Sequence, residues 1–240
     1  FDPENDIEFY YLRPRDIAIY VGNGELNLGI TGRDLLIDSG VTAEEILPLD
    51  FGRSTFRFAA PDEVALSGKR IATAYPGLVE KYLKDKGVEA KVVRLDGAVE
   101  SSVRLGVADV IADVVSTGGT LRAAGLKTFG EPLLTSEAIL IERTGALRDE
   151  AAETVLRRIN GVVIARQYVL VDYDVESKNL ANACALTPGI ESPTISPLQK
   201  EGWSAVRAMV KRKEVNKIMD DLYRVGARGM LVTEIGRAHV

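Results

Sequence analysis

The chain has 240 residues, is 46% hydrophobic and 27% charged, and carries a formal net charge of −5. This composition is typical of a globular protein with a sizeable core. The acidic balance, with no basic stripe interleaved with aromatic residues, argues against a nucleic-acid partner, and no apolar run approaches the roughly 20 residues of a membrane span. A single cysteine, Cys184, excludes an intramolecular disulfide and favours a reducing compartment, so we expect a cytoplasmic protein.

The first part of the chain predicts an α/β unit. We expect a strand over residues 7–12, a helix over 14–22, a buried strand over 26–30 and the start of the next helix at 31–35. Pro14 suits the first position of a helix, where its missing N–H is not needed. The sequence opens at Phe1 without an initiator methionine or a signal-peptide pattern. It reads as the middle of a domain, and we expect an N-terminal segment to be absent from this chain.

The clearest pattern lies between residues 70 and 121. Strands are predicted over 70–74, 89–95 and from 109 onward, and they alternate with helices over 78–86 and from 96 onward. This alternation predicts a parallel sheet, whose ligands bind at the carboxyl ends of the strands. The residues expected at that edge are Thr73, Tyr75, Asp96, Gly97, Asp113 and the loop 116–120.

The loop after the third of these strands favours a phosphate site. It consists of Ser116, Thr117, Gly118, Gly119 and Thr120, and it leads into a short helix. Backbone N–H groups at a helix N-terminus, aided by the hydroxyls, would bind a phosphate dianion. The Gly-Lys-Ser/Thr ending of a Walker A loop is missing, so we expect no cation in the loop.

The preceding acid, Asp113, could accept hydrogen bonds from the two hydroxyls of a ribose. Together, acid and loop suit a ribose 5-phosphate. The alternative is an ordinary strand-to-helix turn with Ser/Thr capping.

A short internal similarity suggests two lobes. Residues 24–35 and 106–121 each lead through a strand into a glycine-containing turn, and each follows a helix-like stretch. Two such units predict two similar α/β lobes that face each other across a cleft, with chance similarity between βα units as the alternative. Residues 129–142 are expected to return to the first lobe as strands on either side of Glu137, and a helix follows over 148–159.

The last third has a different pattern. Strands are predicted over 162–171, 193–196, 203–210 and 230–233, and helices over 175–186 and 215–225. The order βαββαβ is that of a ferredoxin-like domain. Small domains of this topology often bind regulators or mediate oligomers, which is an argument from fold analogy alone.

Six segments resemble long-form ATP phosphoribosyltransferase over nearly the whole chain. They are residues 12–17 (LRPRDI), 29–34 (GITGRD), 71–76 (IATAYP), 94–100 (RLDGAVE), 113–121 (DVVSTGGTL) and 187–194 (TPGIESPT). The resemblance implies transfer of the phosphoribosyl group of 5-phosphoribosyl 1-pyrophosphate to N1 of ATP, with release of pyrophosphate and a requirement for Mg²⁺. It implies two lobes of the periplasmic-binding-protein type, a third domain that binds histidine as feedback inhibitor, and a homo-oligomer that cycles between dimer and hexamer. The implied domains are residues 1–54 with 132–164, residues 55–131, and residues 165–240.

The resemblance also assigns site residues. Asp113 and the loop 116–120 match the segment that holds the ribose 5-phosphate. Glu100, Asp34 and Tyr75 are expected to face the cleft, with Tyr75 and Asp34 near the purine nucleotide and Arg33 as a candidate phosphate contact. In the third domain Asp174 matches the acid that meets the amino group of histidine, and Ile190, Ser192 and Thr194 would line the rest of that pocket. The metal ligands stay unassigned.

Simpler interpretations stand beside these assignments. Asp34 and Glu100 could be helix N-terminal or surface carboxylates, Tyr75 a loop aromatic packed on its neighbouring proline, and Asp174 a helix N-cap. Three arginines, Arg33, Arg53 and Arg57, could be plain surface charges.

A rival function follows from one departure from the family. The family's opening strand and its lysine-containing loop have no counterpart in this sequence. The alternative is therefore a non-catalytic bilobed protein or regulatory subunit that holds a small anion in the same cleft.

Overall fold

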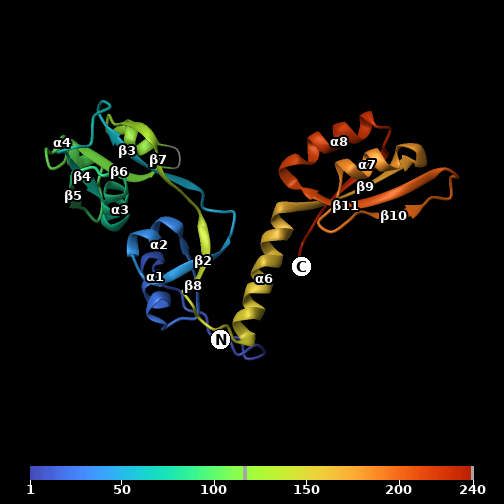
Figure 1. Cartoon of the computed structure of the whole chain (residues 1–240), viewed down its shortest axis with the longest axis horizontal. Helices are drawn as coiled ribbons and strands as arrows, with labels where there is room; N and C mark the ends of the chain where they lie inside the picture. The colour runs from blue at the N-terminus through green and yellow to red at the C-terminus, as the bar shows by residue number, and fades with distance from the viewer. Residues whose placement is uncertain (116–117, 239–240) are drawn as a thin grey trace. The chain divides into compact units, whose positions relative to one another are not determined.

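The computed structural model describes residues 1–115 and 118–238, and the chain divides into two compact units, Phe1–Ala152 and Glu153–Val240 (Figure 1). Ser116 and Thr117 of the predicted phosphate loop lie outside the described residues. Within the described part of the chain, every helix is too short or too polar to cross a membrane.

The first unit contains two lobes, each built on its own sheet. Lobe I has a three-stranded sheet in the order β1-β8-β2, in which β1 and β2 both run antiparallel to β8. Its elements are α1 (Pro14–Asn23), β1 (Leu28–Gly32), α2 (Arg33–Ser39), β2 (Ala43–Pro48) and β8 (Ala138–Arg143). Helix α1 begins with proline as predicted, and its buried Ala18 and Val21 pack against Ile139 and Ile141 of β8.

Lobe II has a five-stranded sheet in the order β5-β4-β6-β3-β7. Its elements are β3 (Ser54–Ala60), β4 (Arg70–Thr73), α3 (Pro76–Lys86), β5 (Lys91–Arg94), α4 (Ser101–Arg104), β6 (Val110–Val115), α5 (Gly119–Ala123) and β7 (Lys127–Ser136). Strands β5, β4 and β6 are parallel, as predicted. The sheet as a whole is mixed, because β3, which the sequence analysis did not predict, inserts antiparallel between β6 and β7.

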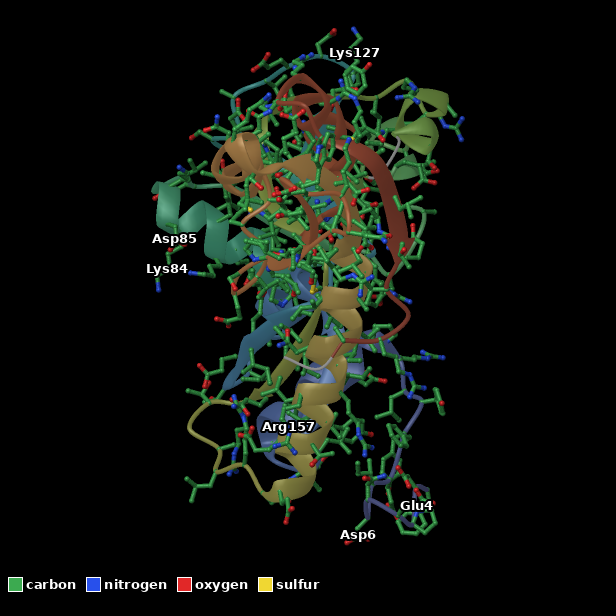
Figure 2. The ribbon with its side chains drawn as sticks, turned by 90° about the vertical axis from the view of Figure 1, so that its right-hand side faces the viewer. Glu4, Asp6, Lys84, Asp85, Lys127 and Arg157 are labelled. Atoms are coloured by element: carbon green, nitrogen blue, oxygen red, sulfur yellow. The ribbon has the colours of Figure 1, made fainter. Side chains whose placement is uncertain are left out.

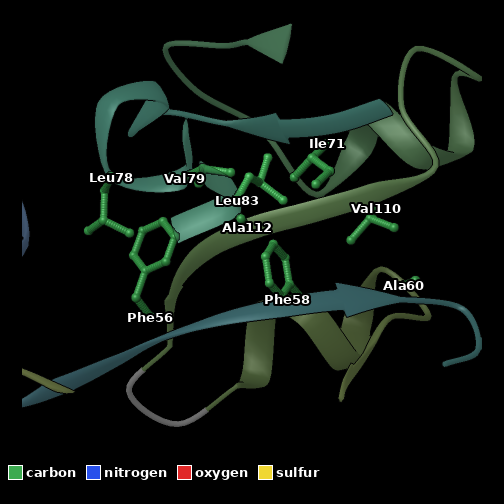
Figure 3. Packing of buried hydrophobic residues seen from close by; sticks show 9 residues of the cluster. All are labelled: Phe56, Phe58, Ala60, Ile71, Leu78, Val79, Leu83, Val110 and Ala112. Carbon is green, nitrogen blue, oxygen red and sulfur yellow. The ribbon is translucent and has the colours of Figure 1, made fainter. Parts of the chain in front are cut away.

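The core of lobe II lies between this sheet and α3. Phe56 and Phe58 project from β3 toward Leu78 and Leu83, and all four side chains are buried (Figure 3). The opposite side of α3 is polar, and Lys84 extends outward from it (Figure 2). This segregation of apolar and charged residues fixes which side of the helix faces the sheet.

Two short segments connect the lobes. Residues 49–53 lead from β2 to β3, and Glu137 alone separates β7 from β8. The predicted strands on either side of Glu137 are confirmed. Their predicted return to lobe I is correct for β8 only, because β7 pairs with β3 in the sheet of lobe II. Leu49 N–H donates to Ala138 O at 3.0 Å and Ala138 N–H to Phe51 O at 2.9 Å, so the segments pair where they cross.

The second unit has the predicted βαββαβ order. Helix α6 (Glu150–Gln167) leads into β9 (Tyr168–Glu176), α7 (Leu180–Leu186), β10 (Thr194–Pro197), β11 (Trp203–Lys211), α8 (Val215–Arg224) and β12 (Arg228–Glu234). The sheet order is β10-β11-β9-β12, with every pair antiparallel. Alternate residues of β9 are buried, and they form a core with Ala183 of α7 and Leu222 of α8. The other face of the sheet carries no helix of this core.

Three predicted elements are wrong in whole or in part. Residues 7–12 form no strand, because Phe9, Tyr10 and Tyr11 are all exposed and the described residues pair with this segment only through an isolated bridge from Asp2 to Ile7. Residues 162–167 are the end of α6 and not a strand, so packing overrides the β propensity of the valine-rich run. Residues 175–176 belong to β9, and α7 begins only at residue 180.

Candidate functional site

Tyr75 lies where the two lobes meet. It precedes α3, and its ring packs edge-on against Phe56 with centroids 5.2 Å apart. Burial raises the pKa of its hydroxyl to about 12, and the negative charges of Asp34 and Asp113 act in the same direction. Asp34 belongs to lobe I and Asp113 to lobe II, so the structure brings together three residues that the sequence analysis assigned to one site.

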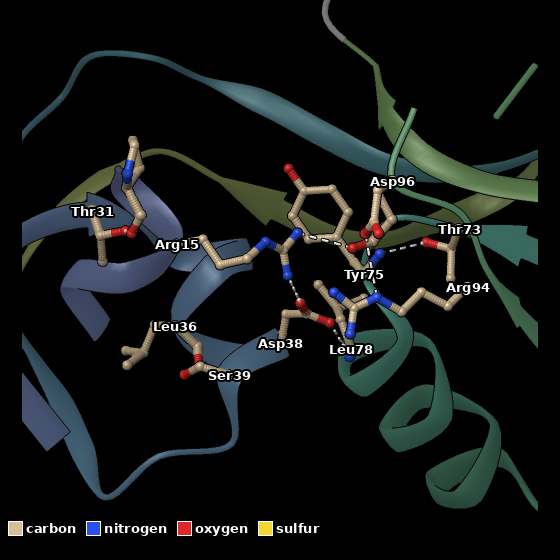
Figure 4. Close-up of polar contacts among 12 residues, drawn as sticks. Arg15, Thr31, Leu36, Asp38, Ser39, Thr73, Tyr75, Leu78, Arg94 and Asp96 are labelled. Atoms are coloured by element: carbon tan, nitrogen blue, oxygen red, sulfur yellow. Dashed lines mark hydrogen bonds and ion pairs between the residues drawn. The ribbon is translucent and has the colours of Figure 1, made fainter. Parts of the chain in front are cut away.

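A second contact between the lobes lies beside Tyr75. The Arg15 guanidinium of α1 is 5.0 Å from the centre of the Tyr75 ring, donates to Ala74 O at 2.8 Å and pairs with Asp38 of α2 (Figure 4). The buried Asp38 carboxylate also accepts from Leu78 N–H at 3.2 Å. A carboxylate of lobe I therefore caps the first helix of lobe II. The sequence analysis assigned no role to Arg15 or Asp38.

Asp113 is a half-buried carboxylate near a second acid. Burial raises its pKa, the N–H of Val114 opposes this by donating at 2.7 Å to Oδ1, and the charge of Glu100 adds to the rise. Glu100 stands at the N-terminus of α4, but its side chain makes no capping bond there. The two acids are thus close enough to interact electrostatically, as the assignment to one site requires.

The described part of the phosphate loop has the backbone that a tight turn needs. Gly118 precedes α5 with φ +69°, a value that glycine tolerates and most residues do not. A depression of about 280 Å³ lies beside it, lined by Glu100, Ser101, Arg104, Thr120, Ala123 and Ala124. Glu100 and Thr120 thus line one hollow, as predicted.

Two arginines near this hollow were missed. Arg104 lines it one helical turn after Glu100, a spacing of four residues that puts both on one face of α4. The Arg122 guanidinium lies over the loop, with Nη1 3.1 Å from the position that a Cβ on Gly118 would occupy. The expectation that the loop carries no cation therefore overlooked a cation from the following helix.

Asp34 and Arg33 begin α2 and are both tied to the end of β7. Asp34 is buried, and the hydroxyl of Ser136 donates to its Oδ1 at 2.8 Å while accepting from its N–H at 3.1 Å. The Arg33 guanidinium makes a two-pronged pair with Glu45 at 2.7 Å for each bond and reaches Glu137 at 3.3 Å. These acids raise the pKa of Arg33 further. The side chain predicted to touch phosphate is therefore already neutralised by carboxylates.

The other two arginines that the sequence left open differ from each other. Arg53 is largely exposed and pairs with Asp50, as a surface charge would. Arg57 is half-buried in β3 opposite Asp113 and donates through Nη2 to Gly130 O, while its buried Nε has no hydrogen-bond partner among residues 1–115 and 118–238. Arg57 is thus not a plain surface charge.

The residues expected to bind the inhibitor histidine are spread over the second unit. Asp174 lies inside β9, so the helix N-cap interpretation is wrong. Its Oδ2 is 3.2 Å from the position of a Cβ on Gly229 of β12. Thr194 opens β10 and pairs with Arg207 of β11, which lies opposite Asp172. Because paired residues point to the same face, Thr194 and Asp174 share the face opposite the helices. Ile190 and Ser192 are exposed in the loop before β10.

The described residues contain no group of three or more His, Cys, Asp or Glu side chains that could hold a metal ion.

Comparison with known proteins identifies the family. Residues 13–161 match the family model described as ATP phosphoribosyltransferase, and residues 165–237 match the model described as HisG, C-terminal domain. The ATP phosphoribosyltransferase of Streptomyces avermitilis is 61% identical over 243 residues, covering 98% of this chain and 85% of the relative. That of Pseudarthrobacter chlorophenolicus is 60% identical over 242 residues, with the same coverage.

A solved structure supports the fold. The ATP phosphoribosyl transferase (HisG:HisZ) complex from Thermotoga maritima matches with a TM-score of 0.57 and 24% identity, over 63% of this chain and 76% of that one. The two sequence models together span both units, including the C-terminal domain that distinguishes the long form. The chain belongs to the ATP phosphoribosyltransferase family, in its long form with a regulatory C-terminal domain.

Proposed function

We propose that this chain transfers the phosphoribosyl group of 5-phosphoribosyl 1-pyrophosphate to N1 of ATP, with release of pyrophosphate, at the junction of its two lobes. The observation that carries this site is that Asp34 of lobe I and Asp113 of lobe II both act electrostatically on the hydroxyl of Tyr75. Lobe II holds the phosphosugar, with the 5-phosphate on the loop 116–120 and the ribose hydroxyls on Asp113. Tyr75 of lobe II and Asp34 of lobe I hold the purine between the two lobes.

The reaction needs no nucleophile from the protein. The adenine nitrogen attacks the anomeric carbon as pyrophosphate leaves, and positive charge develops on the ribose. Positioning of the two substrates, neutralisation of charge and exclusion of water supply the rate enhancement. The carboxylates of Asp113 and Glu100 interact with each other. Neither forms an ion pair with a described residue, so both are well suited to lie near the developing positive charge.

The carboxylates of Asp113 and Glu100 would fit Mg²⁺ bound together with substrate phosphates. Mg²⁺ is usually bound by one or two carboxylates together with substrate phosphates and water. Asp113 and Glu100 supply two interacting carboxylates, and the described residues form no larger metal cluster. When bound there with the pyrophosphate group, Mg²⁺ would neutralise the charge of the leaving group.

The second unit is proposed to be the histidine sensor. Its match to the C-terminal family model supports this role. Asp174 offers a carboxylate for the amino group of histidine, on the face of the sheet opposite α7 and α8. Thr194 shares that face, and Ile190 and Ser192 would complete the pocket. Assembly as dimers and hexamers stays a prediction from the family resemblance.

The proposed activity is tested with the full chain by measuring pyrophosphate release from ATP and phosphoribosyl pyrophosphate, in parallel with equilibrium binding of each substrate. We expect saturable turnover that requires both substrates. Saturable binding without turnover would favour the non-catalytic alternative, and turnover with another base in place of ATP would favour a different phosphoribosyltransferase.

The phosphate loop is tested by Thr120→Val. Thr120 is exposed, and its hydroxyl makes no hydrogen bond to a described residue. Loss of a hydrogen bond to a charged phosphate should weaken phosphoribosyl pyrophosphate binding about tenfold, with ATP affinity changed less than about twofold. Thr128→Val on β7, which is also exposed, is the control. Equal loss of both ligands would contradict the assignment.

Asp113→Asn should raise the stability of the protein and weaken its binding of phosphoribosyl pyrophosphate. The folded state raises the pKa of Asp113, so the ionised carboxylate is destabilising above its pKa and harmless below it. We expect the variant to melt at a higher temperature near pH 7, with the gain fading as the pH falls toward the ordinary pKa of an aspartate, about 4, and to bind phosphoribosyl pyrophosphate less tightly.

The matched control for this prediction is Asp109→Asn. Arg70 holds the pKa of Asp109 well below its usual range, so this carboxylate stabilises the fold at neutral pH and loses its effect as the pH falls. Asp109→Asn should therefore lower the melting temperature near pH 7. A gain from both variants would show that lower net charge alone is responsible.

Asp174→Ala should relieve histidine inhibition, raising the inhibitory concentration about tenfold through loss of a charged hydrogen bond, with little change in the uninhibited rate. The control is Asp172→Ala, on the same strand and face but paired with Arg207 at 2.6 Å. Unchanged inhibition in Asp174→Ala would show that the pocket lies elsewhere.

A further inference from the structure

Glu137 joins three parts of the first unit through one carboxylate. Its Oε1 accepts from Nη2 of Arg33 at 3.3 Å, and its Oε2 accepts from the backbone N–H of Asp50 at 3.0 Å. Arg33 begins α2, Asp50 lies in the segment from β2 to β3, and Glu137 is itself the residue between β7 and β8. Both connections between the lobes are therefore tied to the start of one helix.

Backbone bonds reinforce this arrangement. The N–H of Arg33 donates to Glu137 O at 3.1 Å, next to the hydrogen bonds that join residues 49–51 to Ala138. The side chains of Arg33 and Glu137 are only 22% and 16% exposed, so salt screens their attraction less than it would at the surface.

The backbone at Asp50 has a conformation that needs outside support. Asp50 has φ +58°, and Gly52 two residues later has φ +65°. A left-handed conformation at a residue with a side chain persists where surrounding contacts hold it, and such positions are frequent at hinges and switch regions. The bond from Asp50 N–H to Glu137 is such a contact.

We propose that Glu137 and Arg33 are positioning residues for phosphoribosyl transfer, which fix the angle between the lobes and so bring Asp34 to Asp113 and Tyr75. This inference rests on the proposed function, since it assumes that the reaction takes place between the lobes. It also gives Arg33 a role other than the phosphate contact expected from the sequence.

Substrate binding and phosphoribosyl transfer should depend differently on the angle between the lobes. The phosphate loop and Asp113 both belong to lobe II, so phosphoribosyl pyrophosphate binding does not depend on the angle between the lobes. Transfer does depend on it, because the purine, held between Asp34 of lobe I and Tyr75 of lobe II, must meet the sugar held by lobe II within a fraction of an ångström.

The test compares Glu137→Gln with Glu45→Gln in the full chain. Both changes remove one carboxylate charge beside the Arg33 guanidinium. Glu45 lies on β2 of lobe I, so its replacement leaves the hydrogen bonds between the two connecting segments intact. A glutamine at 137 has an amide NH2 group in place of one carboxylate oxygen, so it loses the arrangement in which Oε1 accepts from Arg33 and Oε2 accepts from Asp50. We expect kcat to fall about tenfold in Glu137→Gln, with the Kd for phosphoribosyl pyrophosphate within about twofold of the parent, and kcat to change less than about twofold in Glu45→Gln.

Hydrogen exchange without substrate gives an independent measurement. Peptides that contain the amide of Asp50 should exchange faster in Glu137→Gln and unchanged in Glu45→Gln. Unchanged exchange, faster exchange with an unchanged kcat, or equal kcat losses in both variants would overturn the inference. Unchanged phosphoribosyl pyrophosphate affinity in Thr120→Val would instead overturn the proposed site, so the two failures are distinguishable.

Arg33→Lys provides a milder variant. Lysine keeps the charge but cannot bond Glu45 through a planar fork while reaching Glu137. We expect a smaller fall in kcat, with the affinity for phosphoribosyl pyrophosphate unchanged. A loss of phosphoribosyl pyrophosphate affinity would instead identify Arg33 as the phosphate contact expected from the sequence and overturn the inference.

Discussion

The hydrogen bonds between the two crossing segments are the constraint on which the rest of the first unit depends. Leu49 and Phe51 pair with Ala138, and the neighbouring Glu137 carboxylate binds both the Asp50 amide and the side chain that opens α2. Each lobe has its own buried core, but the candidate site uses residues of both. The proposed chemistry therefore relies on these contacts, together with the packing of Ile37 of α2 against the core of lobe II, to hold the two lobes in register.

The electrostatics of the site are unusual for a protein that handles phosphates. Asp34, Asp38 and Asp113 all raise the pKa of Tyr75, and the nearest cation, Arg15, already pairs with Asp38. Such a surrounding suits sugar hydroxyls, the amino group of a purine and a divalent cation. Phosphates need another place, and the loop at Gly118, with Arg122 above it and Arg104 nearby, offers one. In the proposed site, the polar groups of the substrates thus bind apart from their anionic groups.

Most of the elements could be predicted because their signals are local. Pro14 at the start of α1 and the glycine that closes α3 each follow from a few neighbouring residues. The failures have a common cause in contacts distant along the chain. Strand β3 is recognisable only once β6 and β7 flank it, and residues 162–167 extend a helix despite their β propensity.

The sequence by itself determined the family, the lobed α/β class, the ferredoxin-like order of the second unit and the membership of Asp34, Tyr75, Glu100 and Asp113 in one neighbourhood. Those conclusions rest on motifs, and motifs record which residues occur, not what surrounds them. Only the tertiary structure decided that Arg33 faces Glu45 and Glu137, that Arg15 links the lobes through Asp38, and that Asp174 stands in a strand. A charged side chain takes its role from the partners that neutralise it, and these lie up to 104 residues away along the chain.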